Sequence, residues 1–233
     1  MPAGADPRIQ SYTALAPDYD DTRYTTPADA LKERFRWRAL RELFPDRPAR
    51  ALDVACGTGR GVLILRDVAA RADGVDGTLE MLAVAQGKIR RGGPPAAVCQ
   101  ANAARLPFAA ATFDLVTCLN FVHLFAPADK QVFIREIARV LKPGGTAVVE
   151  FDNALQGVVL GAVRKYAGTD IGYDWPWVMR GSFPPDLFTI TAMRGTNLPG
   201  IWRVRPLHGL EGAAGRAPLS YLAARMLVRA VRR

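Results

Sequence analysis

The sequence is poor in the residues that build metal sites and disulfide frameworks. Its 233 residues include three cysteines, and Cys56, Cys99 and Cys118 form neither a CxxC pair nor a Cys/His cluster. With His123 and His208 as the two histidines, no metal site is expected. We expect the cysteines to be small buried side chains in a reducing compartment.

Long apolar runs are also missing. The nearest candidate, from Ala154 to Val163, is far shorter than the roughly 20 residues that span a bilayer, and it contains Gln156. The Met1–Gln10 segment has no apolar run, so a signal peptide is not expected. Because 49% of the residues are hydrophobic, the chain can bury a sizeable core, and we expect a cytoplasmic protein.

Acidic residues are outnumbered, 22 against 31 basic ones, which gives a net charge of +9. The excess is concentrated in residues 203–233, where seven arginines stand against one acid, Glu211. Such a balance favours an anionic partner, either a nucleic acid, a membrane surface or an acidic substrate. The alternative is a solvated basic face with no partner.

The first part of the chain has a helical pattern. Thr26 can cap a helix over Thr26–Phe44, and Pro27 suits its first position because no N–H is needed there. Apolar residues four positions apart predict one buried stripe on this helix, formed by Leu31, Phe35, Ala39 and Leu43. Residues 1–48 are therefore expected to form an N-terminal helical cap.

After Pro48, strand patterns alternate with helix patterns. Strands are predicted over Ala51–Ala55, Ala72–Asp76, Ala96–Ala101, Phe113–Leu119 and Thr146–Phe151, and helices over Gly61–Ala70, Thr78–Arg90 and Pro127–Leu141. This alternation predicts an α/β fold, a doubly wound and mostly parallel sheet with helices on both faces. Residues 49–152 form the expected core of that sheet.

The last third of the chain, residues 153–233, breaks the alternation. The segment Asn153–Pro185, rich in glycine and aromatic residues, reads as an insertion over the carboxyl edge of the sheet. A helix over Pro185–Thr196, a strand over Trp202–Leu210 and an amphipathic helix over Pro218–Arg233 are expected to follow. The final helix either rests on anionic lipid or packs on the sheet of its own domain.

The stretch "ARALDVACGTGRG" lies where such a sheet binds its ligands, beyond the carboxyl end of the first strand. Gly57 and Gly59 allow a sharp turn and a close approach to the main chain. Val62 replaces the third small residue of a dinucleotide fingerprint, and the G-K-[ST] of a phosphate loop is absent. Asp53 repels pyrophosphate but suits a ligand that carries an ammonium and a sulfonium.

At this point the sequence resembles the class I S-adenosylmethionine-dependent methyltransferases, especially the quinone-biosynthesis-like group that methylates small molecules. "LDVACGTGRG", "GVDGTLEML", "ANAARLPFAAATFDLVTCLNFVHLF" and "EIARVLKPGGTAVVEFDN" resemble four of its motifs, in order, over about Tyr12 to Asn153. The resemblance implies a Rossmann-like sheet of the seven-stranded type. It also implies S-adenosyl-L-methionine as the cofactor.

The resemblance also implies roles for individual residues near the first strand. The turn formed by Ala55, Cys56, Gly57, Thr58 and Gly59 runs under the methionine part of the cofactor, beside Asp53, and the family usually has glycine where Ala55 stands. Tyr19 matches an aromatic residue that closes over the cofactor, or it is a packing residue. These residues are the predicted methionine end of the site.

Other implied roles lie after the second, third and fourth strands. Asp76 accepts hydrogen bonds from both ribose hydroxyls, with Gly77 and Met81 following it, or it only caps the helix near Thr78. Asn102, beside Ala103, stands where the family has an aspartate that accepts from adenine, and it is otherwise an ordinary turn residue. Asn120 faces the methionine end or the methyl acceptor.

Two features bear on the methyl acceptor. His123 follows the fourth strand and is placed to act as a base, although it can equally pack beside Phe121 and Phe125. Aromatic residues of the insertion either supply a surface for an aromatic or lipophilic acceptor or form the insertion's own core, and they are Tyr166, Tyr173, Trp175, Trp177 and Phe183.

The sequence therefore predicts an enzyme that transfers a methyl group by in-line displacement to a small acceptor. The alternatives are an RNA methyltransferase, suggested by the net charge, and a non-catalytic S-adenosylmethionine-binding protein on the same fold. A nicotinamide-dependent dehydrogenase is a more distant alternative. Nucleic acid is not the expected partner, and a peripheral contact with an anionic membrane remains open. The acceptor atom and the oligomeric state are not determined by the sequence.

Overall fold

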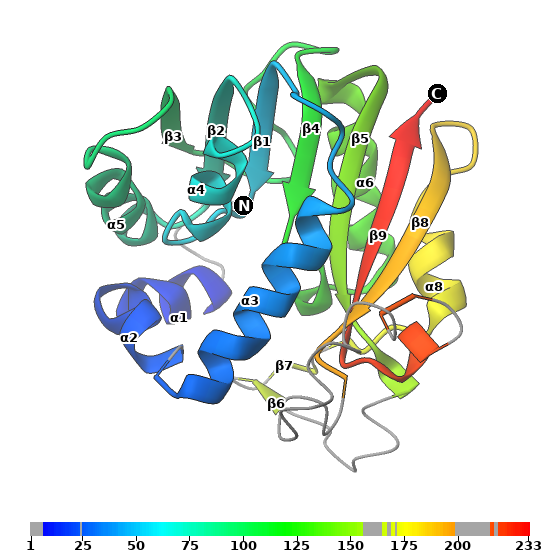
Figure 1. The fold of residues 1–233 in the computed structure, drawn as a ribbon, viewed down its shortest axis with the longest axis horizontal. Coiled ribbons are helices and arrows are strands. Elements are labelled where there is room, and N and C mark those ends of the chain that lie inside the picture. Colours follow the sequence, from blue (N-terminus) through cyan, green and yellow to red (C-terminus); the bar gives the residue numbers. More distant parts are fainter. Residues whose placement is uncertain are drawn as a thin grey trace.

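The protein is described by a computed structural model that covers residues 7–23, 25–155, 165–166, 169–170, 172–198, 215–216 and 219–233. Its centre is a seven-stranded sheet in the order β3-β2-β1-β4-β5-β9-β8 (Figure 1). The strands are β1 (Arg50–Val54), β2 (Arg71–Asp76), β3 (Ala96–Gln100), β4 (Phe113–Cys118), β5 (Leu141–Asp152), β8 (Phe188–Thr196) and β9 (Arg225–Arg232). The first five pair in parallel, whereas β9 is antiparallel to both β5 and β8.

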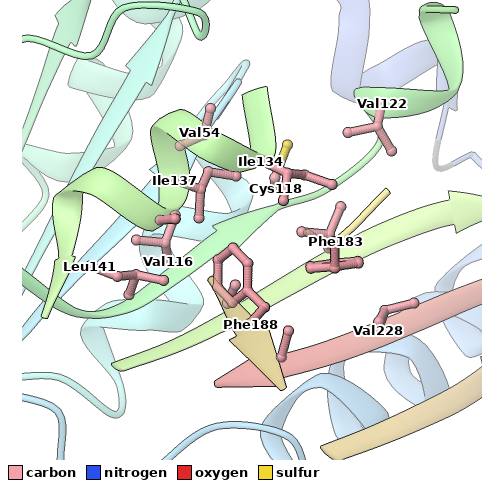
Figure 2. Packing of buried hydrophobic residues seen from close by; sticks show 14 of the residues in the cluster. Val54, Val116, Cys118, Val122, Ile134, Ile137, Leu141, Phe183, Phe188 and Val228 are labelled. Carbon is pink, nitrogen blue, oxygen red and sulfur yellow. The ribbon is translucent and has the colours of Figure 1, made fainter. Parts of the chain in front are cut away.

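Helices cover both faces of the sheet, as predicted. Core residues of α3 (Pro27–Arg41), α4 (Arg60–Arg66) and α5 (Leu79–Ile89) pack on one face. Those of α6 (Pro127–Val140) and α8 (Pro176–Gly181) pack on the other, where Ile134, Ile137 and Phe183 meet the strands (Figure 2). The fold is therefore the predicted α/β, doubly wound and mostly parallel architecture.

Short helices precede the sheet and lie near its carboxyl edge in Figure 1. They are α1 (Pro7–Leu15), the 3-10 turn Ala16–Asp18 and α2 (Tyr19–Arg23). Thr26 caps α3 as predicted, because its side chain accepts a hydrogen bond from the backbone N–H of Asp29 at 3.1 Å.

The buried stripe of α3 differs from the predicted one. Its buried residues are Arg36 and Leu40, and Leu43 is buried just beyond the end of α3, while Phe35 is half-buried. The apolar spacing thus predicted a face of the helix that lies next to the face that is buried. The physical reason is that Arg36 is buried in an ion pair with Glu150. The spacing of apolar residues cannot predict the burial of a charged side chain.

Two predicted helices are strands in the structure. Pro185–Thr196 contains β8, and Pro218–Arg233 contains β9 after a short 3-10 turn (Leu219–Leu222). Because helices cover both faces of the sheet at β9, Met226 and Val228 are buried on one face and Leu227 on the other, and the apolar residues form a run rather than an alternation. The arginines in this run are three and four positions apart, which is also the spacing of polar residues in an amphipathic helix. The predicted C-terminal interfacial helix is therefore wrong, whereas a contact with an anionic membrane stays a prediction from the net charge.

The insertion after β5 contains two short strands, β6 (Lys165–Tyr166) and β7 (Thr169–Asp170), which pair with each other, and α8. The predicted strand Trp202–Leu210, with His208, lies outside the described residues, as does most of the apolar run Ala154–Val163. Within the described ranges, no helix has the length and apolar character that crossing a membrane requires.

Candidate cofactor and acceptor site

A cavity of about 600 Å³ opens where the carboxyl ends of β1, β2 and β4 meet. This is the place where the strand order reverses, since β1 has β2 on one side and β4 on the other. Twelve predicted site residues line it: Tyr19, Asp53, Ala55, Cys56, Gly57, Thr58, Asp76, Gly77, Met81, Asn102, Ala103 and Asn120. Gly59 and His123 are not among its lining residues.

The turn after β1 has an unusual backbone. Ala55, Gly57 and Gly59 have φ values of 58°, 52° and 81°, all in the left-handed region that favours glycine. The strain at Ala55 explains why a glycine would be common at its position. Gly59 serves packing, because a Cβ on it would lie 2.8 Å from the Cβ of Ala85 on α5.

Asp53 is buried beneath this turn. Its Oδ1 accepts a hydrogen bond of 2.6 Å from the Thr117 hydroxyl on β4. Burial raises the pKa of Asp53 to about 7, against the opposing effects of the Thr117 hydrogen bond and the positive charge of Arg36. Asp53 is therefore a carboxyl group whose charge changes near neutral pH.

The second oxygen of Asp53 occupies the space beside Gly61, in the first turn of α4. A Cβ added to Gly61 would lie 2.1 Å from Asp53 Oδ2. A side chain at residue 61 would therefore push the carboxylate out of its position. The glycine at 61 is a residue that the sequence reasoning did not single out.

Substitution Gly61→Ala is expected to lower the free energy of unfolding by about 1–3 kcal/mol, because the added methyl overpacks a buried site. Gly87→Ala is the matched control, since nothing lies within 4 Å of a Cβ there and Gly87 is inside helix α5. That control is expected to be neutral or stabilising by about 0.5–1 kcal/mol. Urea denaturation of both variants measures the difference, and equal effects would contradict the close contact at Gly61.

Asp76 is fixed at the end of β2 by two backbone donors. Its Oδ2 accepts from the N–H of Gly57 at 2.8 Å, and its Oδ1 accepts from the N–H of Thr78 at 2.9 Å. Burial raises the pKa of Asp76 above its usual value, opposed by these hydrogen bonds. Each carboxylate oxygen keeps further lone-pair capacity for a ligand, so both proposed roles of Asp76, capping and ligand binding, are compatible.

Asn102 closes a turn at the edge of the cavity. Its side-chain oxygen accepts from the N–H of Ala104 at 2.8 Å, and its backbone oxygen accepts from the N–H of Arg105 at 2.9 Å. The oxygen expected to receive an adenine amino group is thus already used once. The turn interpretation describes this geometry, and a role of Asn102 in ligand binding stays a prediction.

His123 lies in a 3-10 turn (Val122–Leu124) behind the cavity wall. Its backbone oxygen accepts from the N–H of Gly172 at 2.9 Å. Burial lowers the pKa of the His123 imidazole, which is therefore neutral at pH 7. The neutral form suits a base, but the side chain does not line the cavity, so that role stays a prediction.

The aromatic surface of the cavity differs from the expected one. It comes from the N-terminal helices, α3, the segment after β4 and α6, through Tyr12, Tyr19, Trp37, Phe121, Phe125 and Phe133. Phe121, Phe125 and Phe133 pack on one another, with ring centroids 4.7–5.2 Å apart. Of the insertion's aromatic residues, Phe183 is in the core and Trp177 is 65% exposed, stacked on Trp175. None of Phe183, Trp175 and Trp177 lines this cavity.

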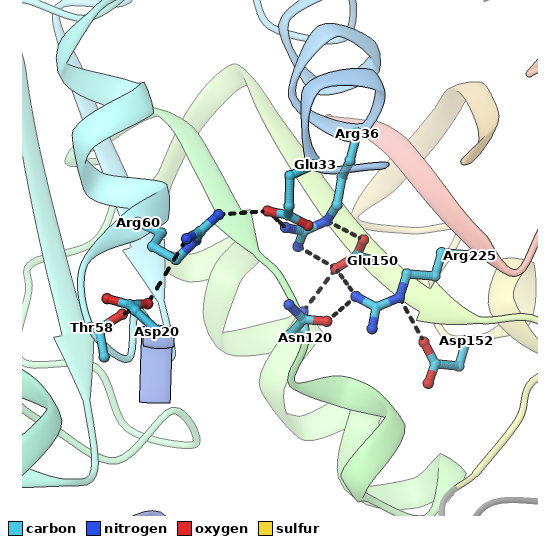
Figure 3. Close-up of polar contacts among 9 residues, drawn as sticks. All are labelled: Asp20, Glu33, Arg36, Thr58, Arg60, Asn120, Glu150, Asp152 and Arg225. Atoms are coloured by element: carbon cyan, nitrogen blue, oxygen red, sulfur yellow. Dashed lines mark hydrogen bonds and ion pairs between the residues drawn. The ribbon is translucent and has the colours of Figure 1, made fainter. Parts of the chain in front are cut away.

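A row of charged side chains runs beside the cavity, from α2 to β9 (Figure 3). Its members are Asp20, Arg60, Glu33, Arg36, Glu150, Arg225 and Asp152, joined in that order by ion pairs of 2.6–4.0 Å and hydrogen bonds. The sequence reasoning missed this row. A single acid inside the apolar strand pattern around Glu150 was the available signal, because a buried carboxylate requires a cation.

Arg36 and Glu150 form the centre of this row. The side chains of Arg36 and Glu150 are 2% and 1% exposed, and two guanidinium nitrogens donate to the carboxylate at 2.6 and 2.7 Å. Burial alone would oppose ionisation of Glu150. The charges of Arg36 and Arg225, with hydrogen bonds from Arg36 and from the Asn120 backbone, nevertheless lower the pKa of Glu150 to about 2.

The start of the row attaches the N-terminal helices to the turn after β1. The Thr58 hydroxyl donates to Asp20 Oδ1 at 3.0 Å. Lys88 donates to the backbone oxygen of Thr58 at 2.8 Å and also pairs with Asp20. Segment 12–20 thus covers the cavity through polar contacts as well as through Tyr12 and Tyr19.

Comparison with known proteins agrees with this geometry. A family described as "Methyltransferase domain" matches residues 52–149. A demethylmenaquinone methyltransferase of Thermus thermophilus is 36% identical over 142 residues, 59% of this chain and 62% of that protein. The ubiquinone/menaquinone biosynthesis C-methyltransferase UbiE of Syntrophotalea carbinolica is 32% identical, over 67% of this chain and 66% of that protein.

A solved structure shows the same fold. The S-adenosylmethionine-dependent methyltransferase of Mesorhizobium loti superposes with a TM-score of 0.63 at 19% identity, covering 85% of this chain and 98% of that one. Residues 52–149 thus match a methyltransferase domain, and the fold is that of the S-adenosylmethionine-dependent class of these enzymes. Within that class the chain is similar to methyltransferases of menaquinone and ubiquinone biosynthesis. The matched segments span about half to two thirds of the length of these curated relatives.

Proposed function

We propose that the protein binds S-adenosylmethionine in the cavity at the ends of β1, β2 and β4 and transfers its methyl group to a small, aromatic or lipophilic acceptor. The observation that supports this most strongly is that one cavity joins a glycine turn, the buried carboxyl group of Asp53, the half-buried carboxylate of Asp76 and a cluster of aromatic rings. Carboxylates suit the cationic and diol parts of the cofactor, and the rings suit the acceptor.

The residues present fit this cofactor. Asp76, held by two backbone donors, can accept from a vicinal diol, and Gly57 leaves the main chain beside it open, with nothing within 4 Å of a Cβ position. When bound, the cofactor supplies a methyl group activated by its positively charged sulfur. Asp53 places negative charge near the turn, which favours a cationic ligand over a phosphate.

The protein's contribution to the reaction is positional. An in-line displacement requires that the acceptor be held in one orientation and kept from water. Trp37, Phe121, Phe125 and Phe133 provide an apolar wall for that purpose. Because the curated relatives include demethylmenaquinone methyltransferases, a reduced demethylmenaquinone is the first acceptor to test.

Titration calorimetry with S-adenosylhomocysteine tests cofactor binding, and conversion of S-adenosylmethionine with reduced demethylmenaquinone tests transfer. We expect micromolar binding of the nucleoside, no binding of NAD⁺, and a methylated quinone by mass spectrometry. Absence of nucleoside binding refutes the proposed cofactor. Binding without turnover on any quinol refutes the proposed acceptor class and favours the non-catalytic alternative.

The affinity for S-adenosylmethionine is expected to rise severalfold from pH 6 to pH 8. With its pKa raised to about 7, Asp53 is mostly protonated at pH 6 and mostly charged at pH 8, and the charged form attracts the sulfonium. S-adenosylhomocysteine, which lacks the sulfonium, should show a weaker dependence. Calorimetry of wild type and Asp53→Asn at both pH values measures this, and an equally steep rise in the variant would assign it to another group.

A further inference from the structure

The side chain of Asn120 is held in one orientation at the cavity wall. Asn120 follows β4 with a φ of 55°, in the left-handed region that asparagine adopts more readily than most other non-glycine residues. Its backbone N–H donates to Glu150 Oε2 at 3.0 Å, and Asn120 lines the cavity. The left-handed backbone at Asn120 is thus tied to the buried Arg36–Glu150 pair.

Arg225 determines which end of the Asn120 amide faces the cavity. Its guanidinium donates to Asn120 Oδ1 (Figure 3). A guanidinium has donors and no acceptor, so the atom that faces Arg225 must be the amide oxygen rather than the nitrogen. Arg225 is itself held by Glu150 at 3.4 Å and Asp152 at 3.6 Å. The amide therefore cannot flip without losing a charge-assisted hydrogen bond.

The Asn120 amide nitrogen is consequently the atom left for a ligand. Among the described residues, Asn120 makes side-chain contact with Arg225 through its oxygen, and its Nδ2 donates to no protein group. Asn120 Nδ2 is not one of the fully buried atoms that lack a hydrogen-bond partner. Because it has no protein partner, it must be accessible to solvent, and Asn120 lines the cavity. An amide that turns its oxygen to Arg225 and its two N–H donors to the cavity selects an oxygen and disfavours an ammonium.

We propose that Asn120 Nδ2 donates a hydrogen bond to an oxygen atom of the bound ligand, with Arg225 and Glu150 as its positioning residues. The inference rests on the proposed function. Two ligand oxygens have the required chemistry, the carboxylate of the cofactor's methionine part and the carbonyl or phenol oxygen of the methyl acceptor. The N–H donors of Asn120 can bind the cofactor carboxylate or the acceptor oxygen, and the experiment below distinguishes the two.

Variant Asn120→Asp tests the donor because it keeps the shape but replaces both N–H donors by an oxygen. The probes are S-adenosylhomocysteine, 5′-methylthioadenosine, which lacks the carboxylate, and 1-naphthol added to the nucleoside-saturated protein. We expect at least a tenfold loss of affinity for one oxygen-bearing probe. Loss for S-adenosylhomocysteine but not for 5′-methylthioadenosine assigns the cofactor carboxylate. Loss for 1-naphthol alone assigns the acceptor.

Two further variants guard against effects of charge and folding. Asn120→Gly removes the amide while accepting the positive φ, and should show the same selective loss. Gln131→Glu makes the same amide-to-acid change on the exposed face of α6 and should change none of the affinities. Unchanged affinities for all three probes in both Asn120 variants overturn the inference.

The positioning role of Arg225 has a separate readout. Arg225→Lys keeps only donors beside the amide and should retain most of the affinity, whereas Arg225→Met should reproduce the selective loss of Asn120→Asp. A Met variant that is less stable but binds all probes normally overturns the positioning role. If wild type fails to bind S-adenosylhomocysteine, the proposed function fails and the inference with it. Normal wild-type binding with normal Asn120 variants overturns the inference alone.

Discussion

Substitution Glu150→Gln is expected to lower the free energy of unfolding by about 3–5 kcal/mol. The variant removes the charge of the carboxylate that holds Arg36, which is 2% exposed, through two nitrogens; the contact of Arg36 with Glu33 at 3.4 Å is longer, and removing one partner of a buried pair is strongly destabilising. It also weakens the ties to Arg225 and to the backbone of Asn120. Urea denaturation at pH 7 measures the loss.

The loss of unfolding free energy in Glu150→Gln is expected to become smaller as the pH falls. Because the folded protein lowers the pKa of Glu150 from 4.5 to about 2, its contribution to stability is present above about pH 4.5 and disappears as the pH falls toward 2. The difference between wild type and variant should therefore shrink in acid. Glu42→Gln, which removes exposed ion pairs to Arg38 and Arg216, is the control and should change stability by less than about 1 kcal/mol. Equal effects of the two substitutions would contradict a buried pair.

Substitution Asp76→Ala is expected to weaken S-adenosylhomocysteine binding by about 1–3 kcal/mol or more, which is at least about fivefold. The alanine removes the acceptors proposed for the ribose hydroxyls, and it also releases the N–H groups of Gly57 and Thr78 that shape the cavity floor. Asp76→Asn keeps one acceptor oxygen and should lose less. Calorimetry of the three proteins gives the order of affinities.

The control for that experiment is Asp67→Ala, which removes an exposed pair with Arg41 far from the cavity lining. It should bind the nucleoside as wild type does. Circular dichroism shows whether each variant is folded before its affinity is compared. A folded Asp76→Ala protein with unchanged affinity would refute the ribose assignment and leave Asp76 with a capping role only.

The parallel part of the sheet was predictable because its determinants are local. Strands β1, β2 and β4 are short apolar runs followed by a turn signal and a helical pattern, so the order of these elements follows directly from the sequence. β8 and β9 were not predictable in the same way. Met226, Leu227 and Val228 are all buried because both faces of the sheet are covered at β9, and a run of that kind carries no strand periodicity.

The site residues also divide into those that the local sequence predicts and those that it does not. Residues in the turns after β1 and β2 were found because turn chemistry is encoded in adjacent residues, as at Gly57 and Asp76. The charged row was missed because Arg36 and Glu150 are 114 positions apart in the chain, and only the packing of α3 on the sheet brings them together. The aromatic wall was misassigned for the same reason.

The place of β9 in the sheet also dictates an order of assembly. β8 precedes β9 in the chain, yet β8 joins the sheet through β9 alone. During translation β8 therefore leaves the ribosome with no strand to pair with and stays an open edge until Arg225–Arg232 inserts beside β5. In that interval β8 and the open edge of β5 are both accessible to chaperones and to mispairing with other molecules.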